Sequence, residues 1–254
     1  MISVIIPYHN NITTIREAVQ SVLDQTYSDL EILIIANGSS DKDSLVNELP
    51  DDTRIRLVWF DESLDASGAR NIGVKEAVGE YVAFLDADDY WGRDKLTFQM
   101  KVMERLDGRD NPPILCFTAR ALITDDGKPT GRVISCSKYI NREMLLRTNQ
   151  INCSSVLLKR EVALANPFPA GKIHEDYALW LTLLDGGHYA TGINRPLLYY
   201  RLSRGSRSSN KFKSAAMHFR TLRFAGVGFG KALVLMISYT CQGLKKYYGK
   251  SEVK

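Results

Sequence analysis

Three carboxylates follow a short apolar run near the middle of the chain. The run extends from Tyr81 to Leu85, and the acids are Asp86, Asp88 and Asp89. Such a run predicts a fully buried strand, and in open α/β sheets ligands bind outside the carboxyl ends of the strands. Carboxylates this close together favour a hard divalent cation that also binds a diphosphate. A solvated loop of turn-forming and helix-capping aspartates is the alternative.

A second pair of acids, Glu175 and Asp176, opens an apolar helical segment. Carboxylates in the first turn of a helix are favoured by the helix dipole. Position alone therefore does not distinguish a functional pair from two residues that stabilise the start of a helix.

The elements that position these acids alternate between strand and helix in the first half. This order predicts right-handed crossovers and a parallel sheet in an α/β fold of the nucleotide-binding type. Strands are expected over residues 3–7, 31–36, 55–60 and 81–85, with helices after Asn10 or Asn11 and from Ser67 to Ala77. The second half is less regular, with helices expected over 95–106 and from 175, and strands over 114–119, 154–158 and 197–202.

Charge is divided unevenly along the 254 residues. Residues 201–254 hold twelve basic side chains and one acidic one, a net charge of +11, whereas residues 1–200 hold 21 basic and 28 acidic ones, a net charge of −7. A basic tail on an acidic body predicts attraction to phospholipid, nucleic acid or a phosphorylated substrate. Nucleic acid is the least favoured of these, because no nucleic-acid-binding motif is found.

The four cysteines are scattered along the chain with no C-x-x-C pair. A disulfide framework or structural zinc site is therefore not expected, and a reducing compartment is. The sequence starts directly with a strand, so no signal peptide is expected.

Residues 211–247 are expected to be helical, with an apolar stretch over 224–239. Lys231 and several glycines interrupt this stretch, which favours a helix lying at a membrane surface over a spanning one. Flanking basic residues suit an anionic cytoplasmic leaflet. A helix packed on the domain and a dimer contact are the alternatives.

Six motifs in this order resemble those of the inverting glycosyltransferases of family two, which have the GT-A fold. The resemblance covers about residues 1–210. The motifs are Ser-Val-Ile-Ile-Pro-Tyr-His-Asn (3–10), Asn-Gly-Ser-Ser-Asp (37–41), Ala-Arg-Asn-Ile-Gly (69–73), Leu-Asp-Ala-Asp-Asp (85–89), Glu-Asp-Tyr-Ala-Leu-Trp (175–180) and Tyr-Tyr-Arg (199–201).

The resemblance implies a nucleotide-binding, mostly parallel central sheet with helices on both faces, followed by C-terminal amphipathic helices. Residues 1–210 form the expected glycosyltransferase domain, divided into a nucleotide-binding half (1–90) and an acceptor half (91–210). Residues 211–254 form the basic amphipathic tail.

The same resemblance implies which residues bind the donor. Those residues are Pro7, Tyr8, His9, Asn37, Ser39, Arg70, Asp86, Ala87 and Asp88. His9 stands where the family often has a tyrosine that stacks on the base, and its alternative is a half-exposed loop histidine. The alternative for Arg70 is a structural ion pair beneath the sheet edge.

By this resemblance Asp88 ligates Mn²⁺ or Mg²⁺, and Asp86 bonds the donor's ribose or a metal-bound water. The metal stabilises the charge that develops on the leaving diphosphate. Asp89 faces the sugar or caps the next helix.

Asp176, with Glu175 beside it, is the implied general base, because an inverting transfer needs one carboxylate to take the proton of the acceptor hydroxyl. Trp180, one turn further, is expected in the core, and Tyr177 is a candidate for the acceptor pocket.

In relatives the region that follows the last motif can fold over the donor diphosphate, so the resemblance implies a candidate lid. Guanidinium groups match phosphate geometry, and a lid excludes water. The candidate lid residues are Arg201, Arg204, Ser206 and Ser208. A solvated basic loop is the alternative.

One position departs from the family pattern. The family usually has an acidic pair before Gly38, and this chain has Ala36-Asn37. Asn37 can still bond a base edge through its amide. The missing acid weakens the inference that the donor is a uridine nucleotide, and it is compatible with weak donor binding or an inactive protein.

The expected function is transfer of a sugar from a nucleotide-diphosphate sugar, a UDP-hexose in the first instance, to a saccharide hydroxyl in cell-surface polysaccharide synthesis. The expected acceptor is lipid-linked, and the enzyme is expected in the cytoplasm, peripheral on the inner face of the plasma membrane. A homodimer is left open. The alternatives are a non-catalytic membrane-associated partner with a degenerate donor site, and a nucleotidyltransferase.

Overall fold

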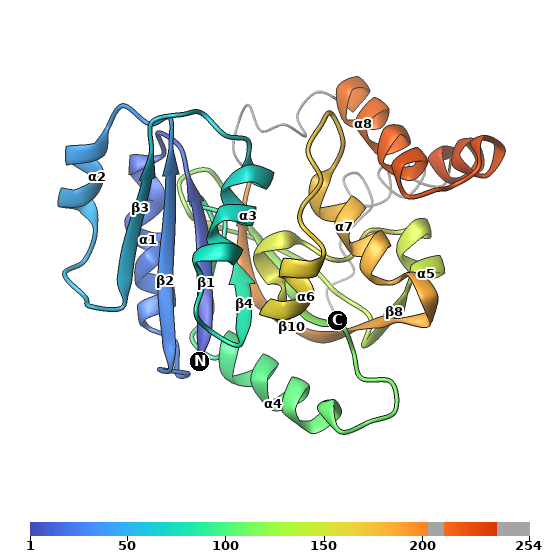
Figure 1. Cartoon of the computed structure of the whole chain (residues 1–254), viewed down its shortest axis with the longest axis horizontal. Helices are drawn as coiled ribbons and strands as arrows, with labels where there is room; N and C mark the ends of the chain where they lie inside the picture. The colour runs from blue at the N-terminus through green and yellow to red at the C-terminus, as the bar shows by residue number, and fades with distance from the viewer. Residues whose placement is uncertain (203–210, 238–254) are drawn as a thin grey trace.

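A ten-stranded sheet runs through the molecule, with helices on both of its faces (Figure 1). The computed structural model describes residues 1–202 and 211–237. The strands follow the order β3-β2-β1-β4-β9-β6-β10-β5, and β7 and β8 pair with β6 and β10 beside this path. In chain order the elements are β1 (Ile2–Tyr8), α1 (Ile12–Leu23), β2 (Leu30–Asn37), α2 (Lys42–Glu48), β3 (Ile55–Phe60), α3 (Ala66–Glu76), β4 (Tyr81–Phe84), β5 (Tyr90–Trp91), α4 (Lys95–Asp107), β6 (Leu115–Ile123), β7 (Pro129–Ile134), β8 (Tyr139–Asn141), α5 (Arg142–Arg147), a 3-10 turn (Cys153–Ser155), β9 (Leu157–Lys159), α6 (Arg160–Ala165), α7 (Glu175–Leu183), a second 3-10 turn (Asp185–Gly187), β10 (Tyr189–Arg201) and α8 (Lys211–Phe224).

The first four strands confirm the predicted parallel sheet. β1 pairs in parallel with β2 and β4, and β2 pairs in parallel with β3. Successive side chains of a strand point to opposite faces, and helices cover both faces here. Ile5 and Phe84 therefore join the apolar cluster that includes residues of α3 and α7. Val4 and Ala83 join the cluster that includes residues of α1 and α4.

The second half adds strands of both directions to this mostly parallel sheet. β9 pairs antiparallel with β4 and β6, and β6 pairs in parallel with β10. The strand expected over 154–158 starts later than predicted, because the Asn152 side chain accepts the N–H of Ser154 at 2.9 Å and holds a 3-10 turn. β10 is longer than the strand predicted over 197–202 and ends at Arg201, beside the acidic loop.

Helix α3 approaches the sheet closely. Its N-terminal cap is Asp65, whose carboxylate accepts the N–H of Gly68 at 2.8 Å, so the helix starts at Ala66, one residue before the predicted start at Ser67. Gly73 faces β1 so closely that a Cβ atom there would lie 2.4 Å from Cγ2 of Ile5. Glycine permits this close approach of the helix backbone to the sheet. Arg70 lies one turn earlier on the same helix and is therefore held close to the sheet.

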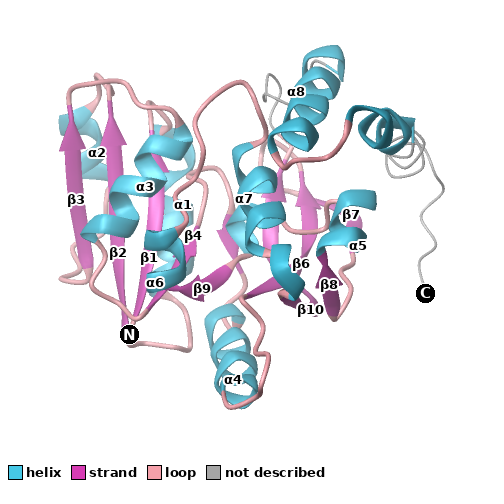
Figure 2. Ribbon diagram, turned by 45° about the vertical axis from the view of Figure 1, so that its right-hand side comes forward, coloured by secondary structure: helices cyan, strands magenta, loops and turns pink. Residues whose placement is uncertain are grey.

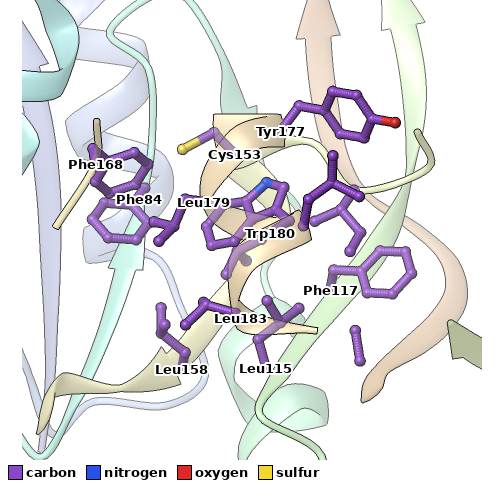
Figure 3. Close-up of a cluster of buried hydrophobic side chains, with 14 of the residues drawn as sticks. Phe84, Leu115, Phe117, Cys153, Leu158, Phe168, Tyr177, Leu179, Trp180 and Leu183 are labelled. Atoms are coloured by element: carbon purple, nitrogen blue, oxygen red, sulfur yellow. The ribbon is translucent and has the colours of Figure 1, made fainter. Parts of the chain in front are cut away.

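The start of α7 is held by an aromatic cluster that Figure 3 shows around Trp180. Trp180 is fully buried, as predicted. The ring of Phe168 meets Trp180 and Phe84 edge-on, with centroids 5.9 and 5.0 Å apart. The prediction that Tyr177 lines an acceptor pocket is wrong. The side chain is buried, and its hydroxyl donates to the carbonyl of Leu145 at 3.2 Å.

Helix α8 begins at the predicted domain boundary but packs on α7. The N–H of His174 donates to Oγ1 of Thr221 at 2.9 Å, and the ring of His218 stacks on Tyr177 with centroids 5.2 Å apart. The boundary at residue 210 therefore separates elements that share one core.

Residues 211–224 and 229–237 are helical, and one side of this segment packs on the domain. Residues 238–254 of the predicted tail lie outside the described residues. Within the described ranges, no helix is both long enough and apolar enough to cross a membrane.

The buried His218 makes the packing of α8 sensitive to pH. Burial, with His174 nearby, lowers the pKa of His218 to about 4. The unfolded chain, with a histidine pKa of about 6.5, then binds more protons than the folded one below that pH. The contribution of neutral His218 to the free energy of unfolding is therefore fully present above pH 6.5. It falls by on the order of 2–3 kcal/mol as the pH is lowered towards 4.

We therefore expect His218→Phe, which keeps a ring on Tyr177 but cannot titrate, to flatten this part of the pH dependence in urea unfolding between pH 4.5 and 7.5. The control is His188→Phe at an exposed position, which should leave the dependence unchanged. Equal slopes for wild type and His218→Phe would contradict the assignment.

Candidate active site

A pocket of about 450 Å³ opens beside the carboxyl ends of β1 and β4, a volume suited to a small-molecule ligand. It brings the donor motifs of the first half together with the acid pair of α7. The predicted site residues that line it are Pro7, Tyr8, His9, Asn37, Arg70, Asp86, Ala87, Asp88, Glu175 and Asp176. Carboxylates almost ninety positions apart in the sequence therefore share one cavity.

Arg70 joins the two groups of acids. Its guanidinium donates to Asp86 at 2.6 Å and to Glu175 at 3.4 Å. The side chains of Arg70 and Glu175 are 4% and 11% exposed, whereas that of Asp86 is 36% exposed. Arg70 lines the pocket, but its guanidinium is already paired with two carboxylates. The structure therefore contains the structural ion pair that the sequence analysis gave as the alternative role of Arg70.

Asp176 lies at the other end of this network. Its Oδ1 accepts the N–H of Tyr177 at 2.7 Å. Burial, together with the neighbouring Glu175 carboxylate, raises the pKa of Asp176, and Arg70 opposes this shift. A carboxylate with a raised pKa is a stronger base, which suits a group that accepts a proton.

Arg201 lies beneath the acidic loop and not above the pocket. Its backbone N–H donates to Asp89 at 3.0 Å, and its guanidinium donates to the carbonyls of Asp88 (2.7 Å) and Asp125 (2.8 Å) and pairs with Glu17. The prediction that Arg201 belongs to a lid is therefore corrected: it is a buried clamp on the loop. The other lid candidates, Arg204, Ser206 and Ser208, lie outside the described residues.

Asp89 neither faces the pocket nor caps a helix. It is buried, and burial together with the charges of Asp86 and Asp88 raises its pKa well above the ordinary value. Its contact with the N–H of Arg201 makes it part of the loop's support.

The loops that follow β1, β2 and β3 are tied together by side chains. Asn37 Oδ1 accepts the N–H of Leu64 at 3.0 Å, and its Nδ2 donates to the carbonyl of Tyr8 at 3.4 Å. His9 Nδ1 contacts the carbonyl of Asn37 at 2.7 Å. Ser39 does not line the pocket; its hydroxyl accepts the N–H of Asn10 at 3.1 Å.

The departure at Ala36 does not open a gap in the pocket. Ala36 is fully buried in the apolar cluster under α1 and pairs with Tyr8 in the sheet. The residues that line the pocket do not include Ala36.

Sequence reasoning missed several lining residues: Asn11, Leu64, Ala66, Asn152, Cys153, His174, Tyr200 and Met217. Asn11, Leu64, Ala66 and His174 adjoin predicted motifs or helix starts and could have been found there. Met217 could not, because the tail was expected to lie apart from the domain. Burial raises the pKa of the Cys153 thiol well above its ordinary value, so this cysteine is not an activated nucleophile.

The carboxylate oxygens of the pocket could bind a hard cation only if a bound phosphate and water completed its coordination. Within residues 1–202 and 211–237 no three His, Cys, Asp or Glu side chains form a metal-binding group. Asp86 is paired with Arg70, so Asp88 is the principal candidate ligand. Mg²⁺ and Mn²⁺ sites of this kind take one or two carboxylates and fill the remaining positions with phosphate oxygens and water.

Comparison with known proteins identifies the family to which the chain belongs. The family model described as glycosyl transferase family 2 matches residues 3–148. The chain is 35% identical to the UDP-Glc:alpha-D-GlcNAc-diphosphoundecaprenol beta-1,3-glucosyltransferase WfaP of Escherichia coli, over 97% of this chain and 95% of that protein. It is 33% identical to WfgD of the same organism, which carries the same activity name, over 97% and 95% of the two chains.

Solved structures show the same architecture. Staphylococcus aureus TarS 1–349 in complex with UDP-GlcNAc matches with a TM-score of 0.70 at 15% identity, over 96% of this chain and 72% of that one. The mannosyltransferase PcManGT of Pyrobaculum calidifontis, in complex with GDP-Man and Mn²⁺, matches with a TM-score of 0.64 at 18% identity, over 98% and 76% of the chains.

The fold is therefore that of the GT-A glycosyltransferases. Within this class, the chain belongs to glycosyltransferase family 2.

The clamp formed by Arg201 can be tested by Arg201→Lys. A single ammonium group cannot satisfy the carbonyls of Asp88 and Asp125 together with Glu17. Unsatisfied buried acceptors cost about 1–3 kcal/mol each, so we expect a loss of this size in urea unfolding and weaker binding of UDP with Mn²⁺ by calorimetry. Arg195→Lys on the same strand, at an exposed position, is the control and should change stability by less than about 0.5 kcal/mol. Similar results for the two variants would show that Arg201 does not hold the loop.

Proposed function

We propose that this glycosyltransferase transfers a hexose from a uridine diphosphate sugar, with inversion, to a hydroxyl of a lipid-linked saccharide. The observation that carries the proposal is the shared pocket of Asp88 and Asp176. A direct displacement needs a group that supports the leaving diphosphate and a base that faces the acceptor.

The side chains divide this work. Asp176 accepts the proton of the acceptor hydroxyl, and its raised pKa favours that step. Asp88, with Asp86 beside it, is placed to hold a divalent cation, which when bound stabilises negative charge on the leaving diphosphate. Arg70 keeps Asp86 and Glu175 close together without mutual repulsion, while His9, Leu64 and Ala66 supply the walls of the base-binding end.

The relatives support the substrate classes. WfaP and WfgD are named for UDP-Glc as donor and a diphosphoundecaprenol-linked GlcNAc as acceptor. Each shares about a third of its residues with this chain over nearly full length. A lipid-linked acceptor implies work at a membrane surface, and we propose the inner face of the plasma membrane, in cell-surface polysaccharide synthesis.

The alternatives are less well supported. Membership of the family excludes the nucleotidyltransferase. A degenerate donor site was suggested by Ala36, but Ala36 is buried and is not among the residues that line the pocket, and the pocket retains Asp86, Asp88 and Asp176.

Two isosteric variants separate the proposed roles. We expect Asp88→Asn and Asp176→Asn each to lower kcat at least about 10²-fold. Asp88→Asn should also weaken binding of UDP with Mn²⁺, whereas Asp176→Asn should leave that binding unchanged. In wild type, kcat/KM should fall as pH drops through the raised pKa of Asp176, because the base must be ionised. Asp110→Asn, at an exposed acid, is the control; full transfer in Asp176→Asn would remove it from the mechanism.

The donor can be identified without knowing the acceptor. Slow hydrolysis of UDP-, GDP- and dTDP-sugars is followed with Mn²⁺ present. We expect release of UDP from a UDP-hexose, lost with EDTA and in Asp88→Asn. Release from GDP- or dTDP-sugars alone would overturn the uridine assignment, and release that persists in EDTA would overturn the metal requirement.

A further inference from the structure

The C-terminal helices have two faces of opposite character. After α8, a turn at Gly226 (φ +76°) leads into a second helix that the structure describes over residues 229–237. Val227, Ala232 and Leu235 point inward and are buried in the cluster of α7. This face anchors the segment to the domain.

The opposite face is apolar and exposed. Phe229, Leu233, Val234 and Ile237 are 61%, 47%, 65% and 68% exposed, and Phe224 at the end of α8 is 56% exposed. Leu233 and Ile237 are four residues apart, so they share one side of the helix, with Val234 beside them. These five side chains, here called the outer apolar face, are five of the thirteen large apolar residues that are exposed in the described part of the chain. Such a concentration marks an interaction surface.

The charged residues of the segment that carries the outer apolar face are all basic. Residues 211–237 contain five basic residues and no acidic one. Arg220 and Arg223 are exposed on α8, and Lys231 pairs with Glu143 of α5 at 3.1 Å. Exposed apolar side chains with basic neighbours suit an anionic lipid surface. A second copy would bring the same basic side chains face to face across a twofold axis, which electrostatic repulsion disfavours.

The outer apolar face belongs to a segment that also reaches the active site. Met217 of α8 lines the pocket, and Thr221 accepts the N–H of His174 next to the acid pair. Figure 2 shows α8 at the end of the sheet towards which β1, β2 and β3 point. The pocket and the C-terminal helices thus lie at the same end of the fold.

We propose that the outer apolar face docks on an anionic lipid bilayer and so holds the pocket at the level of lipid headgroups. The purpose of this docking rests on the proposed lipid-linked acceptor, but the docking itself does not. Phe229, Leu233, Val234 and Ile237 enter the acyl boundary while Arg220 and Arg223 contact the headgroups. The segment lies on the bilayer and is not inserted across it.

The test uses the full chain in vesicle flotation. Vesicles of phosphatidylglycerol and phosphatidylethanolamine are compared with vesicles of phosphatidylcholine alone. Wild type should bind the anionic vesicles, and binding should weaken as salt is raised, because surface charges are screened. Val234→Glu/Ile237→Glu should reduce binding at least tenfold. Val78→Glu, at an equally exposed position (68%) after α3, is the matched control and should bind like wild type.

Two further readouts keep the outcomes distinct. Donor hydrolysis should be unchanged in Val234→Glu/Ile237→Glu, so loss of docking is separable from failure of the proposed transfer. Light scattering reports the oligomeric state. Unchanged vesicle binding in the double variant, absence of wild-type binding, or a wild-type dimer that the double variant dissociates would each overturn the proposal.

Discussion

The contact on which the site depends is the buried guanidinium of Arg70 between Asp86 and Glu175. One carboxylate follows a central strand and the other opens a helix from the second half of the chain. Gathering acids in a pocket shielded from water is costly unless a cation lies among them. Arg70 supplies that cation, and its ion pairs with Asp86 and Glu175 offset the cost of its own burial. The arginine thus joins the two halves of the domain as well as the two groups of acids.

A second arginine holds the backbone of the same acidic loop. Arg201 engages the backbone of the acidic loop, whereas Arg70 engages side chains. The loop that carries Asp86 and Asp88 is therefore held from two directions by groups that cannot lose their charge at physiological pH.

The local parts of this design could be predicted from the sequence, and the long-range parts could not. Apolar strands followed by Asp86 or Asn37 identified the sheet and most of the pocket, because strand direction alone determines which loops meet. Arg201 was wrongly predicted to belong to a lid, because its partners Glu17 and Asp125 are distant in the sequence and no sequence motif indicates that they contact it. Tyr177 was misplaced for a related reason: which side of α7 faces the pocket depends on the packing of α8. Met217 could not be found at all until that helix was seen on the domain.

The amide of Asn37 bears on how base preference could be altered by design. Each end of this amide bonds the backbone of a different loop, one at Leu64 and the other at Tyr8. A change at Asn37 would therefore move two walls of the pocket at once and confuse a loss of shape with a change of specificity. Ala66 lines the same pocket with a methyl group that makes no hydrogen bond, whereas His9 contacts the carbonyl of Asn37 and belongs to the supporting frame. A search for variants that accept other donor nucleotides would therefore begin with pocket residues such as Ala66, whose substitution leaves the contacts between the loops intact.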